Sequence, residues 1–140
     1  MNIVSRIGRA IVAASVILLV SGPVLAAAIY PIDRARILVS PADRAQQTAL
    51  ALKRKFRTVD QIGPGATVAA VLSAAGWPDS REAVVVVGHQ PTLGAIASFL
   101  LSGEEAWWSV KKGAVWWLTN RDKTGASSVV LRVVIAPDFV

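Results

Sequence analysis

The chain has 140 residues, of which 54% are apolar, and this length accommodates one domain with a single hydrophobic core. Fifteen Lys and Arg against nine Asp and Glu give a net charge of +6, which favours anionic partners such as phosphoproteins, nucleotides or membrane surfaces. The absence of cysteine excludes disulfides, thiol nucleophiles and thiolate metal sites, and the single histidine excludes a histidine-rich zinc site. We therefore expect no metal and no other cofactor.

The segment 1–30 has the pattern of a signal peptide or of an apolar membrane helix. Arg6 and Arg9 precede an uncharged run over residues 10–32, and small residues around Ala26 suit cleavage there. The run is also long enough to span a bilayer. It therefore predicts an extra N-terminal apolar helix and a protein that is membrane-anchored or exported. A third interpretation is an altered reading frame, in which case the protein is cytoplasmic.

A strand followed by a helix is predicted next. Residues 36–40 form a short β-branched run, and the helix that follows to residue 52 has Ser40 as its N-cap and Pro41 in its first position. Arg44 then lies in the first turn, where the helix dipole favours acidic side chains. Arg44 is either a solvated arginine or a residue placed for an anionic ligand, and its spacing alone favours the first.

The four basic residues at the end of this helix are interpreted as a solvated face. They are Lys53, Arg54, Lys55 and Arg57. Cations are favoured at a helix C-terminus, and neither aromatic residues nor a nucleic-acid motif lie beside them. We therefore expect no nucleic-acid partner. A short alanine-rich helix over residues 66–75 follows.

Residues 83–101 predict a buried strand, a tight turn and a helix. Four consecutive valines without alternation are typical of a strand buried on both faces of a mostly parallel sheet. The turn, Gly88 to Thr92, contains His89 between the strand end and the helix N-terminus, a place suited to anions. The helix continues to Gly103.

Two further strands, 113–119 and 127–136, are joined by a polar turn and predict an antiparallel hairpin in which the paired tryptophans pack. The whole pattern describes an α/β three-layer sandwich, with a mostly parallel sheet and an antiparallel edge hairpin, over residues 31–140. Ligands of such sheets collect beyond the carboxyl ends of the strands, where both 40–44 and 88–92 lie.

Four ordered motifs resemble those of a known family. They are Ile37-Leu-Val-Ser-Pro41, Arg44-Ala-Gln-Gln-Thr48-Ala, Val87-Gly-His-Gln-Pro-Thr-Leu-Gly94 and Lys111-Lys-Gly-Ala-Val-Trp-Trp117. In this order and spacing they resemble the histidine phosphatases of the short SixA type, whose fold is phosphoglycerate mutase-like. The resemblance runs from about residue 36 to the C-terminus.

The resemblance implies a phosphatase that forms a phosphohistidine intermediate, with two histidines and two arginines around the phosphoryl group. By motif match, Arg44 is the second arginine and His89 the second histidine, and these two are the expected catalytic residues. Ser40 and Gly88 complete the expected phosphate-binding set. The implied partner is a phosphorylated protein or a small phosphoester. Positioned positive charge and hydrogen-bond donors are what phosphoryl transfer requires of a protein.

The family's first strand carries an R-H-G or R-H-A motif with the nucleophilic histidine, and this motif is absent. His89 is the only histidine, and the apolar segment 1–30 stands where that strand is expected. Ser40 is not expected to replace the nucleophile, because no second histidine is present to activate it. Two functions stay open: a truncated phosphohistidine phosphatase, impaired or inactive, and a non-catalytic phosphate- or phosphoprotein-binding pseudophosphatase.

Overall fold

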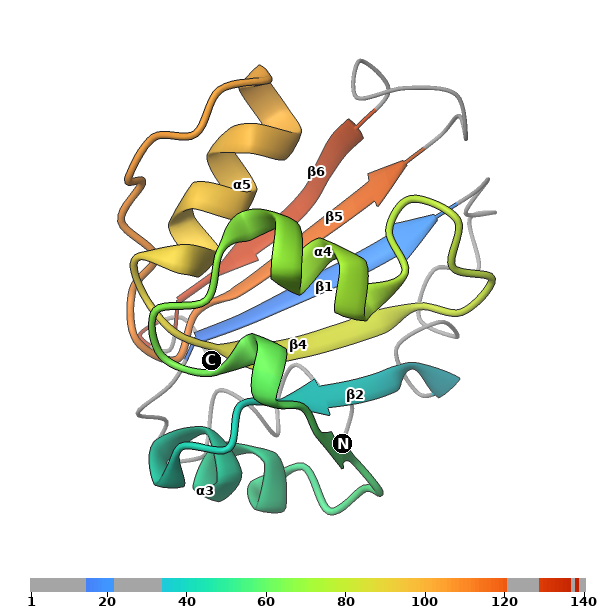
Figure 1. Ribbon diagram of the computed structural model, residues 1–140, viewed down its shortest axis with the longest axis vertical. Helices are drawn as coiled ribbons and strands as arrows, with labels where there is room; N and C mark the ends of the chain where they lie inside the picture. Colours follow the sequence, from blue (N-terminus) through green and yellow to red (C-terminus); the bar gives the residue numbers. More distant parts are fainter. Residues whose placement is uncertain (1–14, 22–33, 121–128, 137, 139–140) are drawn as a thin grey trace.

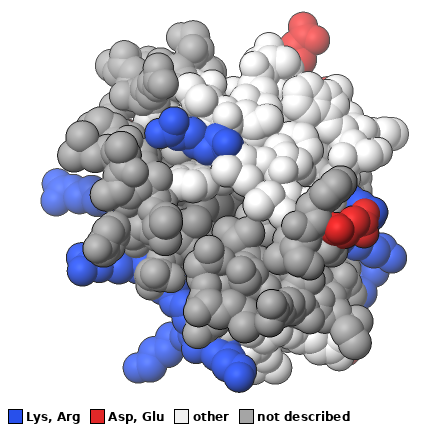
Figure 2. Space-filling view, turned by 180° about the vertical axis from the view of Figure 1, so that it is seen from behind, with Lys and Arg blue, Asp and Glu red and all other residues white. Residues whose placement is uncertain are grey.

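The computed structural model describes residues 15–21, 34–120, 129–136 and 138, which form one sheet with helices on both faces (Figure 1). One helix covers one face of the sheet, and two helices cover the other. This is the three-layer α/β sandwich that the sequence predicts. Figure 2 shows the molecule from behind, where basic side chains predominate over acidic ones, in keeping with the net charge of +6.

The bounds of the elements agree with the predicted strands and helices to within a few residues. The strands are β1 (Ser15–Ser21), β2 (Arg36–Val39), β3 (Arg57–Thr58), β4 (Val84–Gly88), β5 (Val115–Asn120) and β6 (Val129–Ile135). The helices are α3 (Asp43–Ala51), the short 3₁₀ helix η1 (Asp60–Ile62), α4 (Val68–Ala75) and α5 (Thr92–Ser102). Of these, the strands β1 and β3 and the 3₁₀ helix η1 were not predicted from the sequence pattern.

The described strands form a single sheet in the order β3-β2-β4-β1-β5-β6. β2 is parallel to both β3 and β4, and β5 and β6 form the predicted antiparallel hairpin. β1 runs antiparallel to β4 and parallel to β5. The mostly parallel sheet with an antiparallel hairpin at its edge is therefore confirmed, and the antiparallel pairing of β1 with β4 is an addition to it.

β4 organises the core because both of its faces are buried. Val85 and Val87 pack on the side of α3, and Val84 and Val86 pack on the side of α4 and α5. All five residues of β4 are buried, as the run of valines without alternation predicts. The strand is thereby held firmly at the centre of the molecule, and so is the turn that follows it.

The predicted start of the first helix is wrong by two residues. α3 begins at Asp43, and its N-cap is Ala42 in an extended conformation, whereas Ser40 was expected to cap the helix. The reason is that the Ser40 hydroxyl accepts a hydrogen bond from the Ala42 amide, at 3.2 Å, within the turn before the helix. By contrast, Thr67 caps α4 by accepting from the Ala70 amide, as its residue type favours.

The predicted N-terminal apolar helix is wrong for Ser15–Ser21, which form the strand β1 in the interior of the sheet. Val16, Ile17 and Val20 are β-branched, which favours a strand. As a strand, the segment pairs with the backbone N–H and C=O groups of β4 on one side and of β5 on the other. A helix here would leave those groups of β4 and β5 without partners. No helix in the described part of the chain is long and apolar enough to cross a bilayer. The rest of the predicted signal or anchor lies outside the described residues.

Candidate functional site

Two chain segments that follow parallel strands meet at one edge of the sheet. β2 and β4 are adjacent and parallel, so their carboxyl ends lie side by side. Ser40 follows β2 directly, and its amide donates to the Val87 carbonyl oxygen at 3.0 Å. His89 follows β4 directly. The structure therefore brings Ser40 and His89, which are 49 positions apart, to the same edge.

The two side chains contact each other in the protein interior. His89 Nε2 lies 2.6 Å from Ser40 Oγ. The Ser40 side chain is fully buried, and His89 is 8% exposed. Gln46 on α3 fixes the same turn from outside, since its Nε2 donates to the Ser40 carbonyl oxygen at 2.7 Å. The turn after β2 is thus held by three side-chain hydrogen bonds, one of them to His89.

His89 is held in its neutral form by its surroundings. Burial lowers the pKa of His89 below the ordinary value of 6.5, and the positive charge of Arg44 lowers it further. Near neutral pH the ring therefore carries one proton, on one of its two nitrogens. It can donate one hydrogen bond and accept another.

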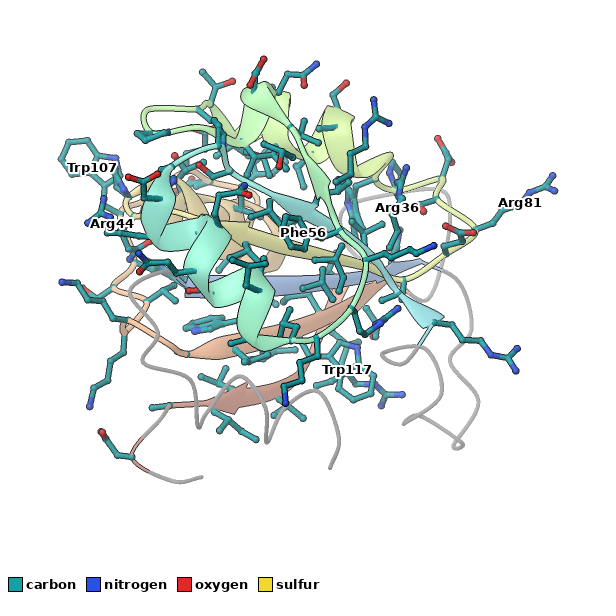
Figure 3. All side chains as sticks on the ribbon, turned by 90° about the horizontal axis from the view of Figure 1, so that it is seen from below. Arg36, Arg44, Phe56, Arg81, Trp107 and Trp117 are labelled. Atoms are coloured by element: carbon teal, nitrogen blue, oxygen red, sulfur yellow. The ribbon has the colours of Figure 1, made fainter. Side chains whose placement is uncertain are left out.

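Arg44 supplies the positive charge at this edge. It lies in the first turn of α3, where it is exposed. Figure 3 shows Arg44 at one end of the molecule and Arg36 and Arg81 at the opposite end. The Ala42 and Ala45 amides are paired within the turn, so α3 presents its guanidinium together with the amides of Asp43 and Arg44 here. Arg44 and His89 together make a basic, donor-rich corner.

The N-terminus of α5 contributes less than its position suggests. The Leu93 amide donates to the His89 carbonyl oxygen, and the Ala95 amide donates to that of Pro91. The Gly94 amide donates to Gln90 Oε1 at 2.8 Å. These three amides are already paired within the protein. The expectation that α5 offers amides to an anion is therefore not supported at these positions.

Gly88 is closely packed between two neighbouring elements. A Cβ at this position would lie 3.4 Å from both Ile62 Cγ2 and Leu93 Cδ2, at the close limit of ordinary van der Waals contact. The glycine lets η1 and α5 close around the end of β4. Its contribution to the site is therefore to keep the backbone of the turn close to both neighbours.

Gln90 is a structural residue of the site that sequence reasoning missed. Its Oε1 accepts from the Gly94 amide in the first turn of α5, and its Nε2 donates to the Trp108 carbonyl oxygen at 2.9 Å. The segment carrying Trp107 and Trp108 is thereby tied to the residue next to His89. Trp107 is 85% exposed and lies at the same end of the molecule as Arg44 (Figure 3). The sequence shows a glutamine directly after the histidine at the strand end, but this position does not predict which residue the glutamine contacts.

The tryptophans of β5 serve packing, as predicted. Trp116 packs against the core on the side of α4 and α5, and Trp117 packs on the side of α3. The ring centroids of Trp108 and Trp116 lie 6.4 Å apart. Among the described residues, no group of three or more His, Asp or Glu is placed to hold a metal ion.

β1 begins at the edge where β2 and β4 end. Ser15, its first residue, pairs with Gly88, and Leu19 pairs with Val84 at the start of β4. The carboxyl end of β1 therefore lies at the far edge of the sheet. Its sequence, SVILLVS, contains neither histidine nor arginine. Neither the direction nor the composition of β1 supplies the missing R-H-G motif.

Solved structures of similar fold are known. A structure of the protein histidine phosphatase SixA complexed with tungstate matches 89% of this chain and 98% of its own, with 16% identity and a TM-score of 0.65. A protein assigned as phosphohistidine phosphatase SixA in Nakamurella multipartitia matches 89% and 97%, with 17% identity and a TM-score of 0.57. No protein-family model and no curated protein matches the sequence. The chain has the fold of the SixA phosphohistidine phosphatases.

Proposed function

We propose that this chain is a phosphatase-fold protein that recognises a phosphoryl group on a protein, and that its phosphohistidine phosphatase turnover is impaired or absent. Arg44 and His89 bind the phosphoryl oxygens. The observation that carries the proposal is their convergence beyond the carboxyl ends of two adjacent parallel strands. The tungstate in the SixA structure is a tetrahedral oxyanion, the geometry of phosphate, which supports this ligand class.

The charges and donors at this corner suit a phosphate. Arg44 presents a planar fork of donors that can bind two oxygens at once, and it is exposed. His89 adds one N–H, and the start of α3 adds backbone amides. Electrostatic stabilisation of this kind is the main protein contribution to phosphoryl transfer. The same groups also suffice for binding without turnover.

Impaired turnover follows from the missing nucleophile. The family mechanism needs a histidine to attack phosphorus and a second to support it, and this chain has one histidine. His89 cannot fill both roles. Ser40 hydrogen bonds to His89, but its side chain is fully buried and gives a phosphorus atom no access to its hydroxyl. The corner therefore binds a phosphoryl group but does not provide for covalent transfer.

Calorimetric titration of the full chain with inorganic phosphate, and separately with tungstate, tests binding. Arg44→Ala is expected to weaken the affinity by about tenfold or more, because a charge-assisted contact is lost. Arg81→Ala is the matched control, since it removes an exposed arginine at the opposite end of the molecule (Figure 3). Equal affinities of the wild type and Arg44→Ala would reject the site.

Turnover is tested with a phosphohistidine-containing protein as substrate. We expect the wild type to release no more phosphate than His89→Ala does. Release well above that of His89→Ala would show that the chain is an active phosphatase, and would overturn the proposed impairment while leaving the binding site in place.

A further inference from the structure

The buried contact between Ser40 and His89 contains information about which nitrogen of the ring carries its proton. Ser40 Oγ has two partners within the described part of the chain: the Ala42 amide at 3.2 Å and His89 Nε2 at 2.6 Å. The amide can only donate. A serine hydroxyl has one hydrogen to donate and two lone pairs with which to accept. The direction of the contact with His89 then follows from the position of the hydroxyl hydrogen.

If His89 Nε2 donated to Ser40, the hydroxyl would receive two hydrogen bonds and its own hydrogen would have no described acceptor. Ser40 is 0% exposed, so bulk solvent offers its hydroxyl no acceptor, and an unpaired buried donor is costly. If Ser40 donates to Nε2, the hydroxyl hydrogen of Ser40 and the lone pair of Nε2 are both paired. We infer that Ser40 donates its hydroxyl hydrogen to His89 Nε2 and thereby holds the neutral ring with its proton on Nδ1.

This tautomer is the opposite of the one that free histidine prefers, which carries its proton on Nε2. The hydrogen bond made by one ring nitrogen decides the state of the other. The surroundings favour a ring able to accept, since burial and the charge of Arg44 both lower the pKa of His89. No residue from Val84 to Ser102, which spans β4 and α5, is charged. The acidic residues Asp43 of α3 and Asp60 of η1 are exposed.

A consequence for the site follows, and it rests on the proposed function. With Nε2 occupied by Ser40, the ring donor that remains for a phosphoryl oxygen is Nδ1–H. Ser40 is then a positioning residue that acts through His89, and it does not contact the phosphoryl group. This role explains why Ser40 is fully buried although Arg44, at the same anion site, is exposed.

The ring nitrogens of His89 can be observed directly by ¹⁵N nuclear magnetic resonance of the full chain. His89 is the only histidine, so a sample labelled with ¹⁵N-histidine gives signals from this ring alone. Above pH 7, in a buffer free of phosphate, we expect a protonated Nδ1 and an unprotonated Nε2. A wild-type spectrum with the proton on Nε2 would overturn the inference.

Substitution of Ser40 tests its part in setting the tautomer. Ser40→Ala is expected to lose the Nδ1–H pattern and to move the ring toward the Nε2–H form, and Ser40→Thr, which keeps the hydroxyl, is expected to restore it. Ser98→Ala is the matched control, because Ser98 is another buried serine whose hydroxyl donates to the Glu104 carbonyl oxygen at 2.7 Å. Retention of the Nδ1–H pattern in Ser40→Ala would contradict the assignment. If Ser40→Ala does not fold, the wild-type spectrum decides.

Addition of inorganic phosphate separates this inference from the proposed function. We expect phosphate to shift the Nδ1 signal more than the Nε2 signal, and Ser40→Ala to weaken binding by about 2- to 10-fold, the worth of one net hydrogen bond. A larger shift at Nε2 would refute the assigned donor. If no signal of the chain responds to phosphate, the proposed binding function is rejected, and the tautomer is judged on the phosphate-free spectrum alone.

Discussion

β4 and β1 are neighbours at the centre of the sheet, and they contribute to the site in opposite ways. β4 ends at the edge where the candidate site lies, and the next residue along the chain is His89. β1 begins at that edge and carries its carboxyl end away from it. Pairing requires only that backbone groups face each other, so a strand of either direction completes the sheet. A site needs the correct end of a strand, so β1 completes the sheet without bringing its carboxyl end to this edge.

The two strands also differ in how the sequence marks them. The valines of β4 stand between a polar turn and a helix with a clear apolar stripe, so local signals identify the strand. The residues of β1 lie within a long apolar run that equally suits a signal peptide or a membrane helix. An apolar run predicts that a segment is buried, but it does not predict whether the buried segment is a strand or a helix.

The largest effect on stability is expected from disrupting β1. Ile17→Pro removes a backbone donor from a strand that is paired on both sides, and the ring clashes with neighbouring backbone. We expect a loss of about 3 kcal/mol or more in the free energy of unfolding, measured by urea denaturation followed by circular dichroism. Ile17→Val, which keeps a β-branched side chain, is the control and is expected to stay close to the wild type.

Deletion of residues 1–30 examines the same strand. It would expose the edges of β4 and β5, and we expect a poorly soluble or partly folded product without a cooperative transition. A cooperative thermal transition of residues 31–140 alone, or an Ile17→Pro variant as stable as Ile17→Val, would show that the sheet does not depend on β1.

The second largest effect is expected where α5 meets the tryptophan segment. A Cβ on Gly94 would overlap the Trp108 carbonyl oxygen, a backbone atom that cannot rotate away. Gly94→Ala should therefore displace the segment from α5 and destabilise the protein by roughly 1–3 kcal/mol. Denaturation combined with tryptophan fluorescence measures both effects. Gly103→Ala is a comparison without a nearby atom, although the positive φ of Gly103 adds backbone strain of its own. An unchanged stability of Gly94→Ala would refute the close contact.

A smaller effect is expected at the turn after β2. Gln46→Ala removes the hydrogen bond to the Ser40 carbonyl oxygen, and we expect a loss of about 1 kcal/mol in stability together with a modest loss of phosphate affinity. Gln47→Ala is the matched control, because Gln47 is the neighbouring exposed glutamine of the same helix. Equal behaviour of the two variants would show that Gln46 does not hold the turn.

The smallest effect is expected from pH. The pKa of His89 is lowered on folding, so between the folded and unfolded pKa values the unfolded chain binds more protons. His89 therefore costs stability as the pH falls below about 6.5, and this cost is absent at pH 7.5. Urea denaturation of the wild type and of His89→Gln at pH 7.5, 6.5 and 5.5 measures it as a difference between the two proteins. A difference that does not change with pH would contradict the lowered pKa.

Much of the fold was readable from local patterns, since each pattern concerns residues close in sequence. The valines predict β4, the apolar stripe predicts α5, and two β-rich runs around a polar turn predict the hairpin of β5 and β6. The motifs around Arg44 and His89 also indicated that both lie beyond strand ends. Such features follow from the periods of strands and helices and from turn chemistry.

The sequence by itself determined the composition of the site: one histidine, an arginine in a first helical turn, and no R-H-G motif. Only the tertiary structure decided the direction of β1 and the contact between Ser40 and His89. Both features depend on contacts between residues that are far apart in the sequence. The direction of an apolar strand depends on which strand edges elsewhere in the fold are free to pair with it. The partner of a buried hydroxyl depends on which polar group the fold places opposite it. Neither can be predicted from residues that are close in sequence.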